Sequence, residues 1–329
     1  MSRTLHQSRG AADLGCPAVH SNFIYEMIPR SVPRLAPILL LLILACNSAG
    51  ETKKIIFLRL GLRIVQERVG MVPLRDEDRP ERLRQLFADT GQCPSERLQV
   101  QETDSDLPNV ICTIPGTGPR TLIIGAHYDH RGGTGALDNW SGAAMLPILA
   151  ESIGSVAMKH TLVFIAFGGK YHGASGSRTF FKQLAENQQH QIAAMINLDS
   201  IGLVTPRYWP DNGLVAPLQL AAVNIHMPQL KSWQVDHDGL SDTDVFRKAK
   251  IASITIHSLG RPGTDLLYVV HSHDDTVKAL DMRAYYETYE LLSVYLAYLD
   301  QITAPIAVGD AGLPQHDRMN QPGSHRRGH

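Results

Sequence analysis

Thr121–Gly142 reads TLIIGAHYDHRGGTGALDNWSG, and this stretch decides the fold. Its first residues, Thr121 to Gly125, form a short apolar run with β-branched side chains, which is typical of a buried parallel strand. A glycine-rich loop follows, and the apolar run from Ala143 to Ile153 predicts a helix after it. A strand, a loop and a helix in this order predict an α/β crossover, whose loop faces a crevice at the carboxyl end of the strand.

The loop of this crossover carries three side chains that suit a metal site. His127 directly follows the strand, and Asp129 lies two residues further on, where a carboxylate can fix the tautomer of a histidine ligand. Asp138 directly precedes the helix and should face the same crevice. The alternative is that the His-x-Asp pattern is accidental and that Asp138 only caps the helix.

Other predicted strands also lead to side chains that suit a metal site. Three apolar runs predict buried strands: Lys159–Phe167, Ala193–Asp199 and Ala252–His257. Asp199 ends the second of these runs, and the third leads to a segment that contains His271. Because the carboxyl ends of parallel strands meet at one edge of an open sheet, we expect His127, Asp138, Asp199 and His271 to lie close together.

The remaining patterns complete the predicted fold. Apolar or alternating runs predict strands at Leu98–Gln101 and Asn109–Ile114 and a short edge strand at Trp233–Asp236. Helical patterns occur at Glu77–Thr90, Ser177–Gln188, Leu214–Asn224, Asp244–Ala249 and Met282–Leu299. This alternation predicts an α/β protein: a three-layer sandwich with a mixed, mainly parallel central sheet that helices cover on both faces.

The motifs GAHYDH, LDNWSG, FIAFGGKYHGASGS, INLDSIG, SDTDVF and HSHDDT follow one another along the chain. In this order they resemble the zinc aminopeptidases of family twenty-eight of the metallopeptidases, which include secreted bacterial aminopeptidases and, more distantly, glutaminyl cyclases. The resemblance covers about Glu77 to Gln301. It implies an aminopeptidase-like hydrolase that cleaves N-terminal peptide bonds with metal-activated water.

The resemblance also implies a set of metal ligands. In the family, five residues hold two zinc ions, and here His127, Asp138, Asp199 and His271 match four of them, with Asp138 as the bridging acid. Asp129 matches the residue that orients the first histidine.

The fifth ligand and the general base are replaced. Where the family has G-E-E-x-G-L-x-G-S, this chain has Gly169–Ser177, GKYHGASGS. Lys170 therefore stands at the position of the general base, and Tyr171 at that of a metal-binding glutamate. In the S-D-H-x-x-F motif, Thr243 replaces the histidine.

One zinc ion is therefore expected rather than two. The ligands His127, Asp138 and Asp199 are all present, and an imidazole with two carboxylates suits zinc with an open position for water. The second ion would keep only Asp138 and His271, with Tyr171 or His172 as weak substitutes.

Lys170 predicts impaired catalysis, because an ammonium cannot accept a proton and a missing general base costs about 10² to 10⁴ in rate. Burial or a neighbouring cation could lower the pKa of Lys170 enough for it to act as a base. We expect instead that its ammonium lies beside Asp138 in the vacant second metal position. For His130, His172 and His273 we expect no role as metal ligands.

Three functions remain open on this basis. The first is the impaired metallo-aminopeptidase. The second is a non-catalytic, metal-binding relative that binds peptides or a cell-envelope partner. A glutaminyl cyclase is a weaker third possibility, because that chemistry also relies on an acid at the replaced positions.

Composition and the N-terminal region bear on location and partners. The formal net charge of −1 gives no reason to expect a nucleic-acid partner. Met27–Cys46 has two arginines before an apolar run that ends in Ile-Leu-Ala-Cys, which predicts a lipoprotein-type signal peptide with Cys46 as the lipidated residue. An uncleaved membrane anchor is the alternative. We therefore expect an exported protein, periplasmic or in the cell envelope, that a lipid anchor attaches to the membrane.

These observations predict five regions: an upstream extension at 1–26, the signal peptide at 27–46, a tether and amphipathic segment at 47–76, the aminopeptidase-like domain at 77–303, and a disordered tail at 304–329. Within the domain, Cys93 and Cys112 flank the strand at Leu98–Gln101. In an oxidising compartment they could form a disulfide, or they could be two unrelated buried thiols.

Overall fold

The computed structural model describes residues 57–210, 212–234, 241–259, 268–302 and 306. These all belong to the second of two compact units, Lys54–His329. The predicted signal peptide and Cys46 lie outside the described residues, as does the tail except for Ile306. Among the described helices, none has both the length and the apolar character that a bilayer span requires.

A seven-stranded sheet in the order β1-β2-β4-β3-β5-β7-β6 forms the centre of this unit. Its strands are β1 (Leu98–Gln101), β2 (Asn109–Ile114), β3 (Thr121–His127), β4 (Thr161–Phe167), β5 (Ile192–Asp199), β6 (Arg207–Trp209) and β7 (Ser253–His257). The four strands β4, β3, β5 and β7 are neighbours and parallel, whereas β2 and β6 pair antiparallel with them. The sheet is therefore mixed with a parallel centre, as predicted.

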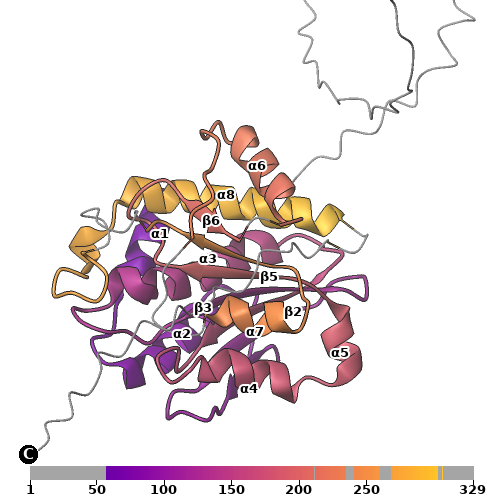
Figure 1. The fold of residues 1–329 in the computed structure, drawn as a ribbon, viewed down its shortest axis with the longest axis horizontal. Coiled ribbons are helices and arrows are strands. Elements are labelled where there is room, and N and C mark those ends of the chain that lie inside the picture. The colour runs from indigo at the N-terminus through magenta and orange to yellow at the C-terminus, as the bar shows by residue number, and fades with distance from the viewer. Residues whose placement is uncertain (1–56, 211, 235–240, 260–267, 303–305, 307–329) are drawn as a thin grey trace, which may run out of the picture. The chain divides into compact units, whose positions relative to one another are not determined.

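Helices cover both faces of the sheet, which confirms the predicted three-layer α/β sandwich (Figure 1). One layer consists of α1 (Leu62–Val69), α2 (Arg79–Ala88), α3 (Ser141–Gly154), α6 (Val215–Asn224) and α8 (Met282–Gln301). The other layer consists of α4 (Ser175–Gln183), α5 (Glu186–Gln191) and α7 (Asp242–Lys248).

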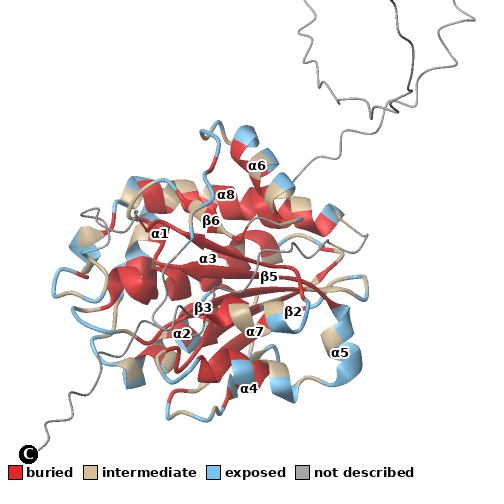
Figure 2. Cartoon of the chain, in the orientation of Figure 1, coloured by how far each residue is buried: buried red, intermediate tan, exposed pale blue. Residues whose placement is uncertain are grey.

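Side chains of successive strand residues enter two different apolar cores. In β3, Leu122 and Ile124 belong to the core beneath α3 and α8, whereas Ile123 packs with Phe180 of α4 and Phe246 of α7. Figure 2 shows the central strands and α3 as buried along almost their whole length. Burial on both faces explains why these strands are continuous apolar runs in the sequence.

Two sequence predictions differ from the structure. The single helix predicted at Ser177–Gln188 is two helices, because the chain is extended at Leu184 and Ala185 between α4 and α5. The edge strand among the described residues is β6, which pairs with β7. Of the predicted strand Trp233–Asp236, Trp233 and Gln234 are not in a strand, and Val235 and Asp236 lie outside the described residues. Ser232, just before it, forms an isolated bridge with Tyr208.

The folded unit includes residues that precede Glu77. Leu60, Val65 and Val69 are buried in the core, and α1 contacts α3 and α8. The backbone N–H of Leu60 also donates a hydrogen bond to the Tyr289 hydroxyl of α8, at 2.8 Å.

Cys93 and Cys112 form a disulfide, with Cα atoms 5.8 Å apart. Cys112 lies in β2, opposite Leu98 of β1 and Phe164 of β4. The disulfide therefore ties the segment before β1 to a strand inside the sheet.

Candidate metal centre

The site lies at the carboxyl ends of the parallel strands β3 and β5. His127 is the last residue of β3, and Asp199 is the last residue of β5. Asp138 lies in the helical turn Ala136–Trp140 that connects β3 to α3. From β3 the chain crosses to β4 on one side and later returns to β5 on the other, so the site occupies the switch point of the sheet.

Three side chains converge there, as the sequence predicts. Nε2 of His127 lies 3.3 Å from Oδ1 of Asp138 and 3.9 Å from Oδ1 of Asp199. One ligand atom from each residue lies within 4.8 Å of the others, and all three side chains are buried. Ligand atoms about 2.0–2.2 Å from a tetrahedral zinc ion lie roughly 3.3–3.6 Å apart, so the separation between His127 and Asp138 matches this spacing and that between His127 and Asp199 is slightly wider.

The charges around His127 also favour a bound cation. Burial lowers the pKa of this imidazole, but Asp129, Asp138 and Asp199 together raise it well above its usual value. Burial likewise opposes the charge on Asp138, yet its contacts with His127 and His271 hold the pKa of Asp138 well below its usual range. The carboxylates of Asp129 and Asp138 therefore stay ionised beside a protonated imidazole, and a divalent ion would replace the proton of His127 as the balancing positive charge.

Two buried side chains hold the crossover that carries Asp138. The carboxylate of Asp275 accepts hydrogen bonds from the backbone N–H groups of Leu137, at 2.6 Å, and Asp138, at 3.1 Å. The amide of Asn139 donates to the carbonyl of Leu198 in β5, at 2.9 Å. Asp138 therefore has its backbone fixed relative to both β5 and the loop after His271.

Asp129 contacts His127 mainly through its backbone. Nδ1 of His127 lies 3.1 Å from the carbonyl oxygen of Asp129 and 3.7 Å from its carboxylate. The carboxylate instead accepts hydrogen bonds from the backbone N–H groups of Lys170, at 3.0 Å, and Tyr171, at 3.2 Å. Asp129 thus positions both His127 and the loop that contains Lys170 and Tyr171.

Tyr171 and His271 close the other side of Asp138. The Tyr171 hydroxyl donates to Oδ2 of Asp138 at 2.7 Å, and Nε2 of His271 lies 2.8 Å from the same oxygen and 2.9 Å from the hydroxyl. Burial and the nearby Asp138 carboxylate raise the pKa of Tyr171, so the phenol stays protonated. A neutral hydroxyl therefore donates to the oxygen of Asp138 that faces away from His127.

Lys170 does not occupy the position that we expected. Its side chain is only 6% exposed, but it makes no ion pair with Asp138 among the described contacts. Nζ of Lys170 lies 5.6 Å from the centre of the Tyr171 ring. The expectation that its ammonium lies beside Asp138 was wrong, because the hydroxyl of the neighbouring Tyr171 bonds to that carboxylate instead.

Two residues of the SDTDVF motif lie behind the site. The Asp242 carboxylate is fully buried, and burial raises its pKa. The Thr243 hydroxyl, at the position of the missing histidine, bonds to Thr255 of β7 at 2.6 Å and not to the metal site.

His130, His172 and His273 are not part of the tripod that His127, Asp138 and Asp199 form. His130 pairs with Asp76 at 2.6 Å, His172 is exposed, and His273 is 91% exposed.

The sequence did not single out several residues that support or border the site. Asp275 lies inside the HSHDDT motif, so its position was a signal, but its contact with the crossover depends on the fold. Arg79 is buried and donates to the backbone carbonyl oxygens of Tyr128 and Thr134. Arg131 stacks on Tyr171, with its guanidinium carbon 4.2 Å from the ring centre. Neither arginine belongs to a recognisable motif.

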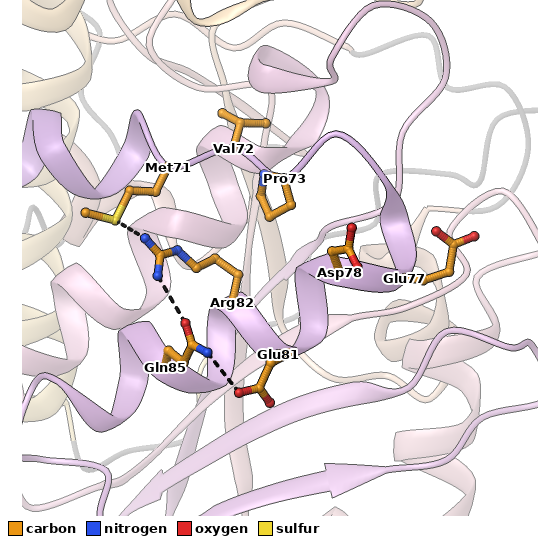
Figure 3. Close-up of a pocket in the computed structure, with 8 residues that line it drawn as sticks. All are labelled: Met71, Val72, Pro73, Glu77, Asp78, Glu81, Arg82 and Gln85. Atoms are coloured by element: carbon orange, nitrogen blue, oxygen red, sulfur yellow. Dashed lines mark hydrogen bonds between the residues drawn. The ribbon is translucent and has the colours of Figure 1, made fainter.

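A groove of about 450 Å³ lies between α2 and the segment that precedes it (Figure 3). Arg82 contacts Met71 and Gln85, and Gln85 donates to Glu81. Asp78 and Glu81 also accept hydrogen bonds from Arg75 and Arg84, which do not line the groove. None of the tripod residues lines it. This groove is separate from the candidate metal centre.

Known proteins resemble this chain in sequence and in fold. The model of "Peptidase family M28" matches residues 109–296. A "Probable leucine aminopeptidase" from Trichophyton verrucosum is 32% identical over 138 residues, which cover 37% of this chain and 36% of the relative. The matched residues span 23–36% of the first three curated relatives.

Solved structures share the fold. The zinc aminopeptidase BSAP from Bacillus subtilis has a TM-score of 0.53 at 23% identity, over 58% of this chain and 49% of that one. A glutaminyl cyclase from an Acidobacteriales bacterium has a TM-score of 0.59 at 15% identity, over 73% of this chain and 93% of that one. Since the family model matches more than half of the sequence, the chain belongs to peptidase family M28.

Proposed function

We propose that this protein is a metal-dependent, aminopeptidase-like hydrolase with a single zinc ion, and that its turnover is impaired. The observation that carries the proposal is the convergence of His127, Asp138 and Asp199 on one buried point, while Tyr171 bonds to the other oxygen of Asp138. One imidazole and two carboxylates are a ligand set that suits zinc with an open position. Zinc bound there would supply a polarised water near neutral pH.

The residues of the chain then have defined tasks. The backbone carbonyl of Asp129 accepts the Nδ1 proton of His127, so Nε2 keeps its lone pair for the ion. Asp138 and Asp199 supply the negative charge, and Asp275 holds the backbone of Asp138. No carboxylate follows β4 at positions 170 and 171, so the site lacks a group that could accept the proton of the attacking water there.

The expected cost of this missing base is about 10² to 10⁴ in rate. A panel of amino-acid 4-nitroanilides with added zinc tests the proposal, using the parent protein, Lys170→Glu/Tyr171→Glu and Asp138→Ala. We expect weak parent activity that the double variant raises by at least tenfold and that Asp138→Ala removes. Parent activity that persists in Asp138→Ala would contradict the proposal.

The second candidate is a non-catalytic protein that binds peptides or an envelope partner at the same site. The hydrogen bonds of Tyr171 with Asp138 and His271 favour it, because they satisfy the second metal position without an ion. Activity in the double variant alone would support this candidate. A glutaminyl cyclase remains the weaker third proposal, since the likeness to solved cyclases is one of fold.

We also propose that the protein is exported and attached to the membrane through Cys46. The sequence Ile43–Cys46 supports lipidation, and the disulfide between Cys93 and Cys112 suits an oxidising compartment. Metabolic labelling with a fatty-acid analogue should label the parent and not Cys46→Ala.

A further inference from the structure

The solvent-facing side of the candidate metal centre carries one exposed cation, Arg131, and the buried ammonium of Lys170 lies near it. Tyr171 and His271 are its partly exposed residues, whereas the three tripod residues are buried. Arg131 stacks on the Tyr171 ring at 4.2 Å, and the ammonium of Lys170 lies 5.6 Å from the same ring. A ligand that reaches the tripod from solvent therefore meets positive charge beside the phenol.

Arg131 is available for such a ligand. It is exposed, and no carboxylate of the described chain forms an ion pair with it. Its guanidinium lies over the Tyr171 ring, and its N–H groups can donate to a ligand because no described carboxylate pairs with them. A planar guanidinium can bind a carboxylate through two parallel hydrogen bonds.

The loop that carries Arg131 is held in place by close backbone approach. A Cβ atom at Gly132 would lie 2.6 Å from the carbonyl oxygen of His271, and one at Gly133 would lie 2.6 Å from those of Ser272 and Asp275. Both glycines also have positive φ, at 72° and 53°. The position of Arg131 beside Tyr171 is therefore built into the loop.

We propose that Arg131 binds a carboxylate of the ligand whose neighbouring amide lies at the metal centre. The Tyr171 side chain lies between Arg131 and the metal centre, since the Arg131 guanidinium lies over its ring and its hydroxyl bonds to Asp138. The spacing of one aromatic side chain fits a carboxylate within a residue or two of that amide. The substrate class is thus a short peptide with a nearby C-terminal carboxylate, or a peptide with an acidic side chain at that place; the inference rests on the proposed function.

Binding of uncleavable ligands to the full-length, zinc-loaded protein tests this assignment. The probes are Leu–Gly with a CH₂–NH link in place of the amide, as free acid and as C-terminal amide, and the matching Leu–Glu-amide and Leu–Gln-amide pair. The first pair tests an α-carboxylate and the second a side-chain carboxylate. Titration calorimetry gives each Kd.

In the parent we expect the acidic member of at least one pair to bind about fivefold tighter, the upper range for an exposed ion pair. Arg131→Met should abolish that preference and Arg131→Lys should retain part of it. Arg63→Met, which alters an exposed arginine of α1, should leave it unchanged.

The inference would be overturned if the parent bound the acidic and amide probes equally well, or if no probe bound. It would also be overturned if the preference for the acidic probe were unchanged in Arg131→Met. The zinc content of the same samples tests the proposed function separately. A protein that retains zinc but shows no preference would overturn only the role of Arg131. A protein without zinc would contradict the single-zinc site, while the ratio of acid to amide binding would still decide the role of Arg131.

Discussion

At the scale of single residues, the sequence predicted which side chains meet but not all of their contacts. His127 and Asp199 end parallel strands, and Asp138 lies in the crossover between β3 and α3, so all three converge at one edge of the sheet. The position of the Lys170 side chain was not readable in this way. Either the Lys170 ammonium or the Tyr171 hydroxyl could lie beside Asp138, and the sequence does not distinguish the two. The geometry of the loop after β4 brings the Tyr171 hydroxyl to Asp138.

Asp275 makes a pH-dependent contribution that can be tested directly. Burial raises its pKa from 3.8 to about 6, although it accepts bonds from Leu137 and Asp138. Between these two values the folded state holds a proton that the unfolded chain has lost, so the free energy of unfolding falls as pH rises towards 6. In metal-free protein, we expect Asp275→Asn to flatten this slope in urea unfolding measured from pH 4 to 7. An unchanged slope would show that Asp275 is not the group responsible.

At the scale of elements, most strands and helices follow from periodicity, and the exceptions have local causes. The run Arg207–Trp209 has only three residues and forms a strand because β7 offers an open edge. The separation of α4 from α5 depends on two extended residues within a continuous helical pattern. Tertiary contacts that the sequence does not display decide both cases.

The first turn of α3 packs closely against Asn139 and β5, and this packing positions Asp138. A Cβ atom at Gly142 would lie 2.6 Å from both Oδ1 of Asn139 and the carbonyl oxygen of Leu198. We therefore expect Gly142→Ala to lower the free energy of unfolding by about 1–3 kcal/mol and to weaken zinc binding. Gly61→Ala is the control, because nothing lies within 4 Å of its Cβ position. Equal denaturation midpoints for the two variants would count against this packing.

At the scale of the molecule, the predicted three-layer sandwich and the family are confirmed. The disulfide joins the segment before β1 to β2. The chain reversal between β1 and β2 brings Leu98 opposite Cys112 and so brings Cys93 near Cys112. The sequence spacing alone left a disulfide and two separate thiols as alternatives.

The disulfide should stabilise the fold without taking part in metal binding. It joins residues 19 positions apart, and a loop of that size contributes about 3 kcal/mol through the unfolded chain. We expect Cys93→Ala/Cys112→Ala to lose about 2–4 kcal/mol in denaturant unfolding and to retain its zinc. A variant as stable as the parent, or one that has lost its zinc while folded, would refute this separation.

The zinc content of purified protein, by anomalous scattering and elemental analysis, tests the central claim most directly. The account predicts one ion in the parent, held by His127, Asp138 and Asp199, and a second ion only in Tyr171→Glu, where a carboxylate replaces the phenol on Asp138. Two fully occupied zinc ions in the parent, or none at these three residues, would contradict it.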